Sequence, residues 1–220
     1  MAVNDSNRIS CEIPRTTDFE VDGRGSAAAW AKAPWLDLVC REGPDYASRC
    51  KLLYSETGLY ALYSGEDRCL TNTMQEDFAL IYKEDVFEIF MQPNPELPLY
   101  LEYEISPLNY ELVYLVPNIV GGFLGWRPVE YEGERKARHA TVVTGGPKIP
   151  GANVTGWSAE MFIPFALFKG YGETPKPGTV WRGNLYRIDY DNNHSRHWTW
   201  APLQQTNYHR HQEFGNFKFM

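Results

Sequence analysis

Carboxylates are concentrated in the middle of the sequence, and a pair of carboxylates is what a glycoside hydrolase needs. Glu88, Glu102 and Glu104 lie in two neighbouring β-type segments, and Glu84 and Asp85 precede them. A hydrolase holds its two carboxyl groups about 5 to 9 Å apart around the scissile bond. Glu88 with Glu102 or Glu104 could form such a pair, but carboxylates that face water are also normal on strands. We keep the hydrolase as the weaker alternative and expect no catalysis.

Glu88 is unusual because its strand is apolar on both faces. Alternation places Glu88 between Val86 and Phe90 on one face of the segment 86–91, while the opposite face is wholly apolar. A carboxylate there needs an ion pair or hydrogen bonds, because burying it alone is costly. Two interpretations remain open. Glu88 has a structural partner such as Arg187, or it accepts hydrogen bonds from sugar hydroxyls.

Aromatic side chains offer a second chemistry, because a flat ring with a polar edge suits the face of a sugar. Trp198 and Trp200 are two positions apart, so they share one face of an extended segment that follows the polar run 191–197. Such indoles often pack in a core, but the polar neighbourhood predicts that at least one is accessible. Tyr82 is a second accessible ring. We expect Tyr82 and one of the two indoles to clamp a pyranose between them.

Histidines and cysteines give no strong metal-binding pattern. No C-x-x-C or H-E-x-x-H motif occurs, so we expect no zinc site. His209 and His211 lie on one side of an extended chain, but a surface or packing role is favoured over a metal site. Cys40 and Cys50 would form a disulfide only on suitably placed neighbouring strands. We expect the four cysteines to be ordinary half-buried thiols.

Composition excludes several classes of function. The net charge of −7 gives no general attraction for phosphate backbones or anionic lipids, so nucleic acid and membranes are not expected partners. No stretch is long and apolar enough for a membrane span, and the familiar nucleotide-binding and hydrolase motifs are absent. The first residues contain no apolar run, so no signal peptide is visible, which leaves the location open.

Alternating and continuous β-type runs dominate the sequence and predict an all-β fold, an antiparallel β-sandwich of two sheets with about nine or ten strands. One domain over residues 1–220 is expected, with short helical turns at 27–33 and 164–168. The polar stretch 121–150 is either an excursion over one edge or a loop near the site. The expected strands are 51–55, 59–64, 86–91, 99–105, 111–116, 140–144, 156–163, 180–189 and 214–219.

The sequence resembles family 9 carbohydrate-binding modules. Its segment 82–90, YKEDVFEIF, resembles the family's aromatic-x-x-D-x-V-E-V-F segment. No single piece is very specific, but seven pieces in the family's order over residues 20–219 are. The six further pieces are Asp22-Gly23 with Trp30, Leu59-Tyr60, 100–107, 156–164, 181–187, and Trp200-Ala201-Pro202 with Phe214-Gly215.

The resemblance implies a sugar-binding β-sandwich in which two aromatic rings hold the sugar, in characterised members at the reducing ends of glucan and xylan chains. Tyr82 matches the first ring, Glu88 matches a glutamate that fixes hydroxyls, and Trp200, or less closely Trp198, matches the second ring. Glu102 and Arg187 complete the candidate polar contacts. The expected partner is a mono-, oligo- or polysaccharide. Family members also hold structural calcium, so the resemblance implies calcium as the one expected cofactor, although the sequence does not mark its ligands cleanly.

A different ligand on the same architecture remains an alternative. Related sandwiches hold haem or other redox ligands, and haem would need an axial ligand from the protein. Met91 or one of the C-terminal histidines would have to supply it. A visible absorption spectrum separates this alternative from sugar binding.

Overall fold

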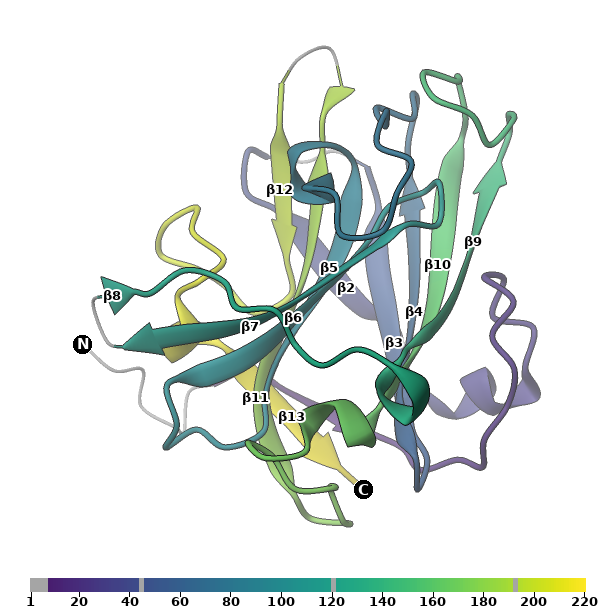
Figure 1. Cartoon of the computed structure of the whole chain (residues 1–220). Coiled ribbons are helices and arrows are strands. Elements are labelled where there is room, and N and C mark those ends of the chain that lie inside the picture. Colours follow the sequence, from purple (N-terminus) through teal and green to yellow (C-terminus); the bar gives the residue numbers. More distant parts are fainter. Residues whose placement is uncertain (1–7, 44–45, 120–121, 192–193) are drawn as a thin grey trace.

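Two sheets packed face to face form the body of the computed structural model, which describes residues 8–43, 46–119, 122–191 and 194–220 (Figure 1). The predicted all-β sandwich is confirmed. The described strands are β1 (Ser10–Ile13), β2 (Leu36–Cys40), β3 (Ser48–Tyr54), β4 (Gly58–Glu66), β5 (Val86–Gln92), β6 (Leu99–Ile105), β7 (Glu111–Ile119), β8 (Gly122–Phe123), β9 (Arg138–Thr144), β10 (Gly156–Pro164), β11 (Val180–Asp189), β12 (Arg196–Thr199) and β13 (Gly215–Phe219).

The strand order explains how the two layers are joined. The first sheet runs β7-β6-β5-β11 and the second runs β2-β3-β4-β10-β9. Neighbours along both paths are antiparallel, and β12 connects the layers because it pairs with β11 on one side and with β2 on the other. The terminal strand β13 adds to β11 and carries β1 as a parallel partner.

Four short strands were not predicted. They are β1, β2, β8 and β12, none longer than five residues, and their sequences carry little alternation. The predicted helical turns are present as the 3₁₀ helices η2 (Ala28–Lys32) and η5 (Phe165–Phe168). The remaining described 3₁₀ turns are η3 (Ile81–Lys83), η4 (Gly133–Arg135) and η7 (His211–Glu213).

The main core lies between the two sheets. Phe87, Ile89 and Met91 alternate along β5 toward this core, and the side chains of β4 and β10 pack against them. The rings of Phe87 and Trp157 have centroids only 4.0 Å apart across the sandwich. β5 lies between β6 and β11, and both of its faces are covered, which is why its sequence is apolar on both faces.

Each sheet also has a covered outer face. The outer face of β5, β6, β7 and β11 packs against residues 79–82 and 203–214, and the outer face of the second sheet packs against residues 19–35. Glu160 fixes the latter segment: its carboxylate accepts hydrogen bonds from Trp30 Nε1 at 2.7 Å and from the Asp22 N–H at 2.8 Å. This contact gives a structural reason for the Asp-Gly…Trp pattern and for the glutamate in the segment 156–164.

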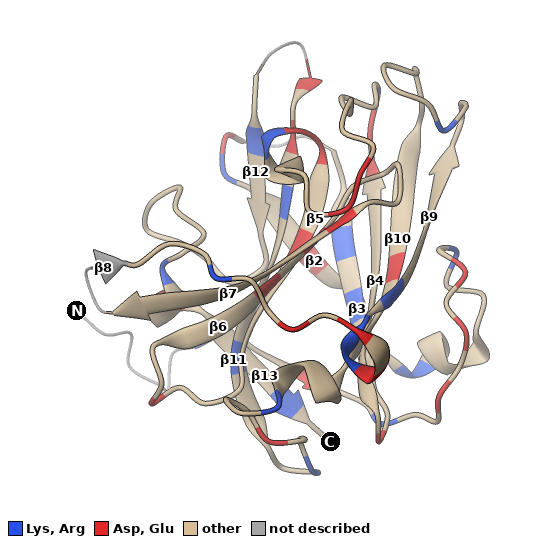
Figure 2. Ribbon diagram, in the orientation of Figure 1, with Lys and Arg blue, Asp and Glu red and all other residues tan. Residues whose placement is uncertain are grey.

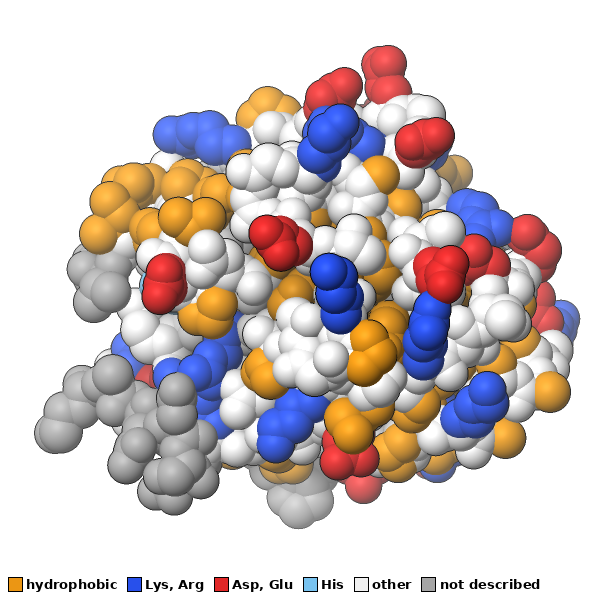
Figure 3. Space-filling view, turned by 90° about the horizontal axis from the view of Figure 1, so that it is seen from below, with side chains coloured by type: hydrophobic (Ala, Val, Ile, Leu, Met, Phe, Trp, Pro, Cys, Tyr) orange, Lys and Arg blue, Asp and Glu red, His pale blue; other side chains and the backbone are white. Residues whose placement is uncertain are grey.

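The four cysteines are free thiols, as predicted. Cys40 and Cys50 do lie on the paired strands β2 and β3, but Cys50 is opposite Leu36 rather than Cys40, so the two sulfur atoms are out of register for a disulfide. No helix within the described residues has the length and apolar character of a transmembrane span. Apolar and charged side chains are interspersed over the face seen from below (Figure 3).

Candidate functional site

A pocket of about 430 Å³ lies on the outer face of the first sheet, between that sheet and the segments that cover it. Its volume is within the range of about 300 to 1,000 Å³ that is typical of small-molecule sites. We call it the ring pocket. The residues that line it are Tyr82, Glu88, Phe90, Glu102, Trp126, Ile188, His197, Thr206, Asn207, Tyr208 and His209.

Aromatic rings from distant parts of the chain form one wall of the ring pocket. Tyr82 belongs to the turn η3, directly before β5, and Trp126 belongs to the segment between β8 and β9. Their rings are nearly parallel, at 22°, with centroids 6.0 Å apart. Trp126 also contacts Tyr114 of β7, at 5.9 Å, and meets the His209 ring edge-on at 6.0 Å. The indole is therefore held between the sheet and the covering segments.

Glu88 and Glu102 line the floor of the ring pocket, and Glu104 lies fully buried beside them. Glu88 on β5 is directly opposite Glu104 on β6, and Glu102 lies two positions earlier on the same face of β6. One carboxylate oxygen of each lies within 4.8 Å of the others, and all three side chains are buried. We call these residues the acid triad. In Figure 2, red segments on the ribbon mark acidic residues within the neighbouring strands β5 and β6.

Burial and mutual repulsion change the protonation of the acid triad. Burial raises the pKa of Glu88 well above its usual range, and the neighbouring Glu102 raises it further. Burial is also the main reason that the pKa of Glu104 lies well above its usual range, and the nearby charges of Glu88 and Glu102 raise it further. Burial raises the pKa of Glu102 to about 7. The three groups therefore share protons as a coupled set.

His209 lies beside the acid triad but does not neutralise it. Its Nδ1 is 2.8 Å from the Tyr100 hydroxyl and 3.8 Å from Oε2 of Glu102. Its backbone carbonyl accepts a hydrogen bond from the Asn118 amide at 2.6 Å. Burial lowers the pKa of His209 to about 4, so the ring is neutral near neutral pH.

Both predicted late indoles are in the core, and neither is accessible. Trp198 is 1% exposed and its Nε1 donates to the backbone carbonyl of Tyr46 at 3.0 Å. Trp200 is 5% exposed and packs against Phe217. The expectation that one of them lies open beside Tyr82 is therefore wrong. The physical reason is that Trp198 faces the main core, where its ring stacks with Tyr46 and lies under the Arg187 guanidinium, while Trp200 follows the end of β12 and packs on Phe217.

Arg187 also lies away from the ring pocket. In the β5–β11 ladder Glu88 is opposite Tyr186, so Arg187 shares a face with Phe87 and points between the sheets. Its Nη2 contacts Asp189 at 2.5 Å and Asp67 at 3.5 Å. It is thus neither the partner of Glu88 nor a lining residue of this pocket.

The register of β5 with β6 and with β11 decides which of the predicted site residues lie together. Tyr82, Glu88 and Glu102 line one pocket, whereas Trp198, Trp200 and Arg187 lie in the main core or beside it. Met91, an expected axial ligand in the haem alternative, is also fully buried in the main core.

Sequence analysis did not single out Trp126. Its segment, 121–150, had been interpreted as an edge excursion or as a loop near the site, and Trp126 does bring this segment over the ring pocket; residue 121 lies outside the described residues. The available signal was a lone indole in the stretch 123–129, FLGWRPV, which has no β-type alternation; the preceding Gly125 has φ at +82°. No periodicity linked that indole to Tyr82.

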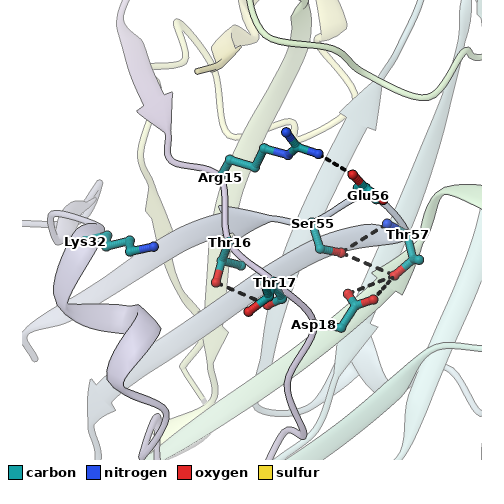
Figure 4. A pocket seen from close by; sticks show the side chains of 8 residues that line it. All are labelled: Arg15, Thr16, Thr17, Asp18, Lys32, Ser55, Glu56 and Thr57. Atoms are coloured by element: carbon teal, nitrogen blue, oxygen red, sulfur yellow. Dashed lines mark hydrogen bonds and ion pairs between the residues drawn. The ribbon is translucent and has the colours of Figure 1, made fainter.

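A second hollow, of about 620 Å³, lies at the other side of the fold and is lined by polar and charged side chains. Figure 4 shows Arg15 and Glu56 directed toward each other and the Thr57 hydroxyl directed to Asp18. Arg15 is thus paired with Glu56 and Thr57 with Asp18, and none of the residues that line the hollow is aromatic. It therefore lacks the surface on which a sugar ring stacks.

Comparison with known proteins places the chain among solved folds. No curated protein matches its sequence. A putative carbohydrate-binding protein from Bacteroides uniformis superposes with a TM-score of 0.79 over 97% of this chain and 100% of that chain, at 15% identity. A carbohydrate binding module family 9 from Caldicellulosiruptor kristjanssonii, also at 15% identity, superposes in complex with cellotriose (TM-score 0.69, 96% and 93% covered) and in complex with glucose (TM-score 0.70, 96% and 96% covered).

The solved structures establish the likeness of fold, and the family assignment rests on the sequence itself. The sequence pattern described as "Carbohydrate family 9 binding domain-like" matches residues 21–220. This range includes the motif segments around Trp30, Glu88, Glu160 and Phe214. The chain therefore belongs to the carbohydrate family 9 binding domain-like family.

Proposed function

We propose that the ring pocket binds a saccharide and that the chain catalyses no reaction on it. The observation that carries this proposal is the combination of the Tyr82–Trp126 ring wall with the buried carboxylates of Glu88 and Glu102 in one pocket. Rings supply apolar contact to the sugar faces, and acceptors on the floor orient its hydroxyls. Membership of the family and the glucose and cellotriose complexes of similar structures support the same ligand class.

The arrangement of the carboxylates argues against hydrolysis. Glu88 and Glu102 lie on adjacent strands of one sheet, so both approach a bound sugar from the same side. A hydrolase needs its two carboxyl groups on either side of the scissile bond. One oxygen of each member of the acid triad also lies within 4.8 Å of one oxygen of the other two, which is shorter than the separation of about 5 to 9 Å between the carboxyl groups of a hydrolase.

Polar side chains at the mouth of the ring pocket would add direction to binding. Thr206 and Asn207 come from the segment before β13 and line the pocket opposite the sheet. Hydroxyl and amide groups of this kind exchange hydrogen bonds with sugar hydroxyls, in competition with water. We therefore expect modest affinity for a single sugar.

Calorimetric titration of the intact chain with glucose and with cellotriose tests the proposal. Saturable binding with one site per chain, to either sugar, is the expected result. Absence of saturable binding to both, with the protein folded by circular dichroism, would reject binding of this class of neutral glucan. Release of product from chromogenic glycosides would reject the non-catalytic assignment.

A further inference from the structure

The acid triad brings three buried carboxyl groups together, and the described residues place no basic side chain of lysine or arginine beside them. Its three side chains are at most 3% exposed. Among the described residues, no lysine or arginine forms an ion pair with Glu88, Glu102 or Glu104, and the base at ion-pair distance is His209. His209 Nδ1 lies 3.8 Å from Oε2 of Glu102, beyond hydrogen-bond distance, and 2.8 Å from the Tyr100 hydroxyl. Buried carboxylates without a counter-charge are strongly destabilising.

The oxygens of the acid triad also lack hydrogen-bond donors. Within the described part of the chain, Oε1 of Glu88, Oε2 of Glu102 and both oxygens of Glu104 have no hydrogen bond of ordinary geometry, although the Tyr82 backbone N–H and the Glu102 carboxyl group lie near Glu104. Most buried polar atoms in native proteins have at least one partner. Glu104 is the clearest case, because it is fully buried and both of its oxygens are unsatisfied. Unsatisfied acceptors grouped in this way indicate a bound group that is positive.

We propose that the floor of the ring pocket binds a cation between Glu88, Glu102 and Glu104. One oxygen of each lies within 4.8 Å of the other two, so one small cation can contact all three. Ca²⁺ takes oxygen ligands at about 2.3 to 2.6 Å. An ammonium group donates hydrogen bonds to carboxylates at about 2.7 to 2.9 Å. Both separations are compatible with that spacing.

The cation can come from a metal or from the ligand. A divalent metal ion would bridge the acid triad and the sugar hydroxyls, and the ammonium group of an amino sugar would enter as part of the saccharide. The inference rests on the proposed function, because Glu88 and Glu102 line the pocket assigned to the saccharide.

The first arm of the experiment tests the metal ion without any sugar. Chelator-treated protein is titrated with calcium chloride by calorimetry, and thermal unfolding is followed with and without calcium. A metal site predicts one bound Ca²⁺ per chain and a higher unfolding midpoint, both lost in Glu104→Gln. Glu111→Gln is the matched control, because Glu111 is a buried carboxylate in the same sheet that accepts hydrogen bonds from Tyr103 and Tyr131.

The second arm tests the ammonium group in the presence of chelator. Glucosamine, glucose and N-acetylglucosamine share one ring, but only glucosamine is charged. An ammonium site predicts that glucosamine binds about tenfold more tightly than the other two sugars. This preference should disappear in Glu104→Gln and persist in Glu111→Gln. If Glu104→Gln does not fold, Glu102→Gln replaces it in both arms.

The outcomes separate this inference from the proposed function. Calcium binding that depends on Glu104, or a glucosamine preference that depends on Glu104, supports the cation site and identifies its source. Glucose binding with neither effect overturns the cation site and leaves the proposed function in place, with protons shared among the carboxyl groups. Calcium binding without binding of any of the sugars or cellotriose supports the cation site and contradicts the proposed function. Absence of all binding contradicts both.

Discussion

The Tyr82 and Trp126 rings lie nearly parallel with their centroids 6.0 Å apart, which is too close for a pyranose between them. A sugar ring that contacts aromatic atoms on both faces needs about 3.5 to 4.0 Å on each side, or about 7 to 8 Å in all. The two rings therefore form one continuous wall of the ring pocket rather than the two sides of a clamp. A sugar would lie along this wall, over the acid triad.

Removal of the indole from this wall should weaken sugar binding selectively. We expect Trp126→Ala to reduce the affinity for glucose or cellotriose by about tenfold, which corresponds to about 1.4 kcal/mol of lost contact. Trp35→Ala is the matched control, because Trp35 is also partly buried but lies under Arg49, at 4.2 Å, on the second sheet. Calorimetric titration compares the variants. Equal sugar affinity in Trp126→Ala and Trp35→Ala would contradict the claim that Trp126 contacts the sugar.

Trp200→Ala should reduce stability instead of sugar affinity. Trp200 packs on Phe217 and fills the space above Gly215, where a Cβ would lie 2.5 Å from the indole. Truncation of a core tryptophan costs about 3 to 5 kcal/mol of the free energy of unfolding. Urea denaturation measures this loss. Normal stability combined with lost sugar binding would mean that Trp200 contacts the ligand.

Arg187→Met should be strongly destabilising because Arg187 balances two buried carboxylates. Its guanidinium contacts Asp67 and Asp189, and Gly65 makes room for it, since a Cβ there would lie 2.6 Å from Nη1. Loss of one partner from a buried ion pair costs about 3 to 5 kcal/mol. Chemical denaturation measures the cost, and calorimetry on the folded protein should give unchanged sugar affinity. A stable variant with weakened binding would place Arg187 in the binding site.

The stability of the protein should fall as the pH rises toward neutrality, with Asp67 as one cause. Burial raises the pKa of Asp67 from 3.8 to about 7. The folded state then keeps a proton that the unfolded state releases, so the stabilising contribution is complete below about pH 4 and is lost as the pH rises through about 7. Asp67→Asn should reduce the difference in the free energy of unfolding between about pH 5 and about pH 8.

Urea denaturation of the wild type and of Asp67→Asn at both pH values measures this difference. The asparagine keeps a carbonyl oxygen for the Cys69 N–H, which donates to Asp67 Oδ1 at 3.0 Å, so the turn should be preserved. Burial raises the pKa of Asp189 as well, so part of the pH dependence of the free energy of unfolding should persist in Asp67→Asn. If this pH dependence is the same in the wild type and in Asp67→Asn, Asp67 does not hold the proton.

The faces of the longer strands could be predicted from the sequence, because alternation with period two is local. This placed Glu88 correctly on a face with Val86 and Phe90. The position of Arg187 could not be predicted in the same way. It depends on the register in which Glu88 meets Tyr186, and register is set by contacts between strands that are distant in the sequence.

The aromatic partners depend on tertiary structure even more. The polar run before Trp198 suggested exposure, but the indole lies in the main core, stacked with Tyr46 and under the Arg187 guanidinium. Trp126 lies in a segment without periodicity, and its contact with Tyr82 follows from the path of residues 122–137 over the first sheet. Local sequence carries no information on either contact.

A crystal of the intact chain soaked in cellotriose tests the central claim most directly. The account predicts electron density for a sugar ring in the ring pocket, against Tyr82 and Trp126, with a hydroxyl at hydrogen-bond distance from Glu88 or Glu102. Sugar density elsewhere, for example in the hollow beside Arg15 and Lys32, with the ring pocket empty, would contradict it.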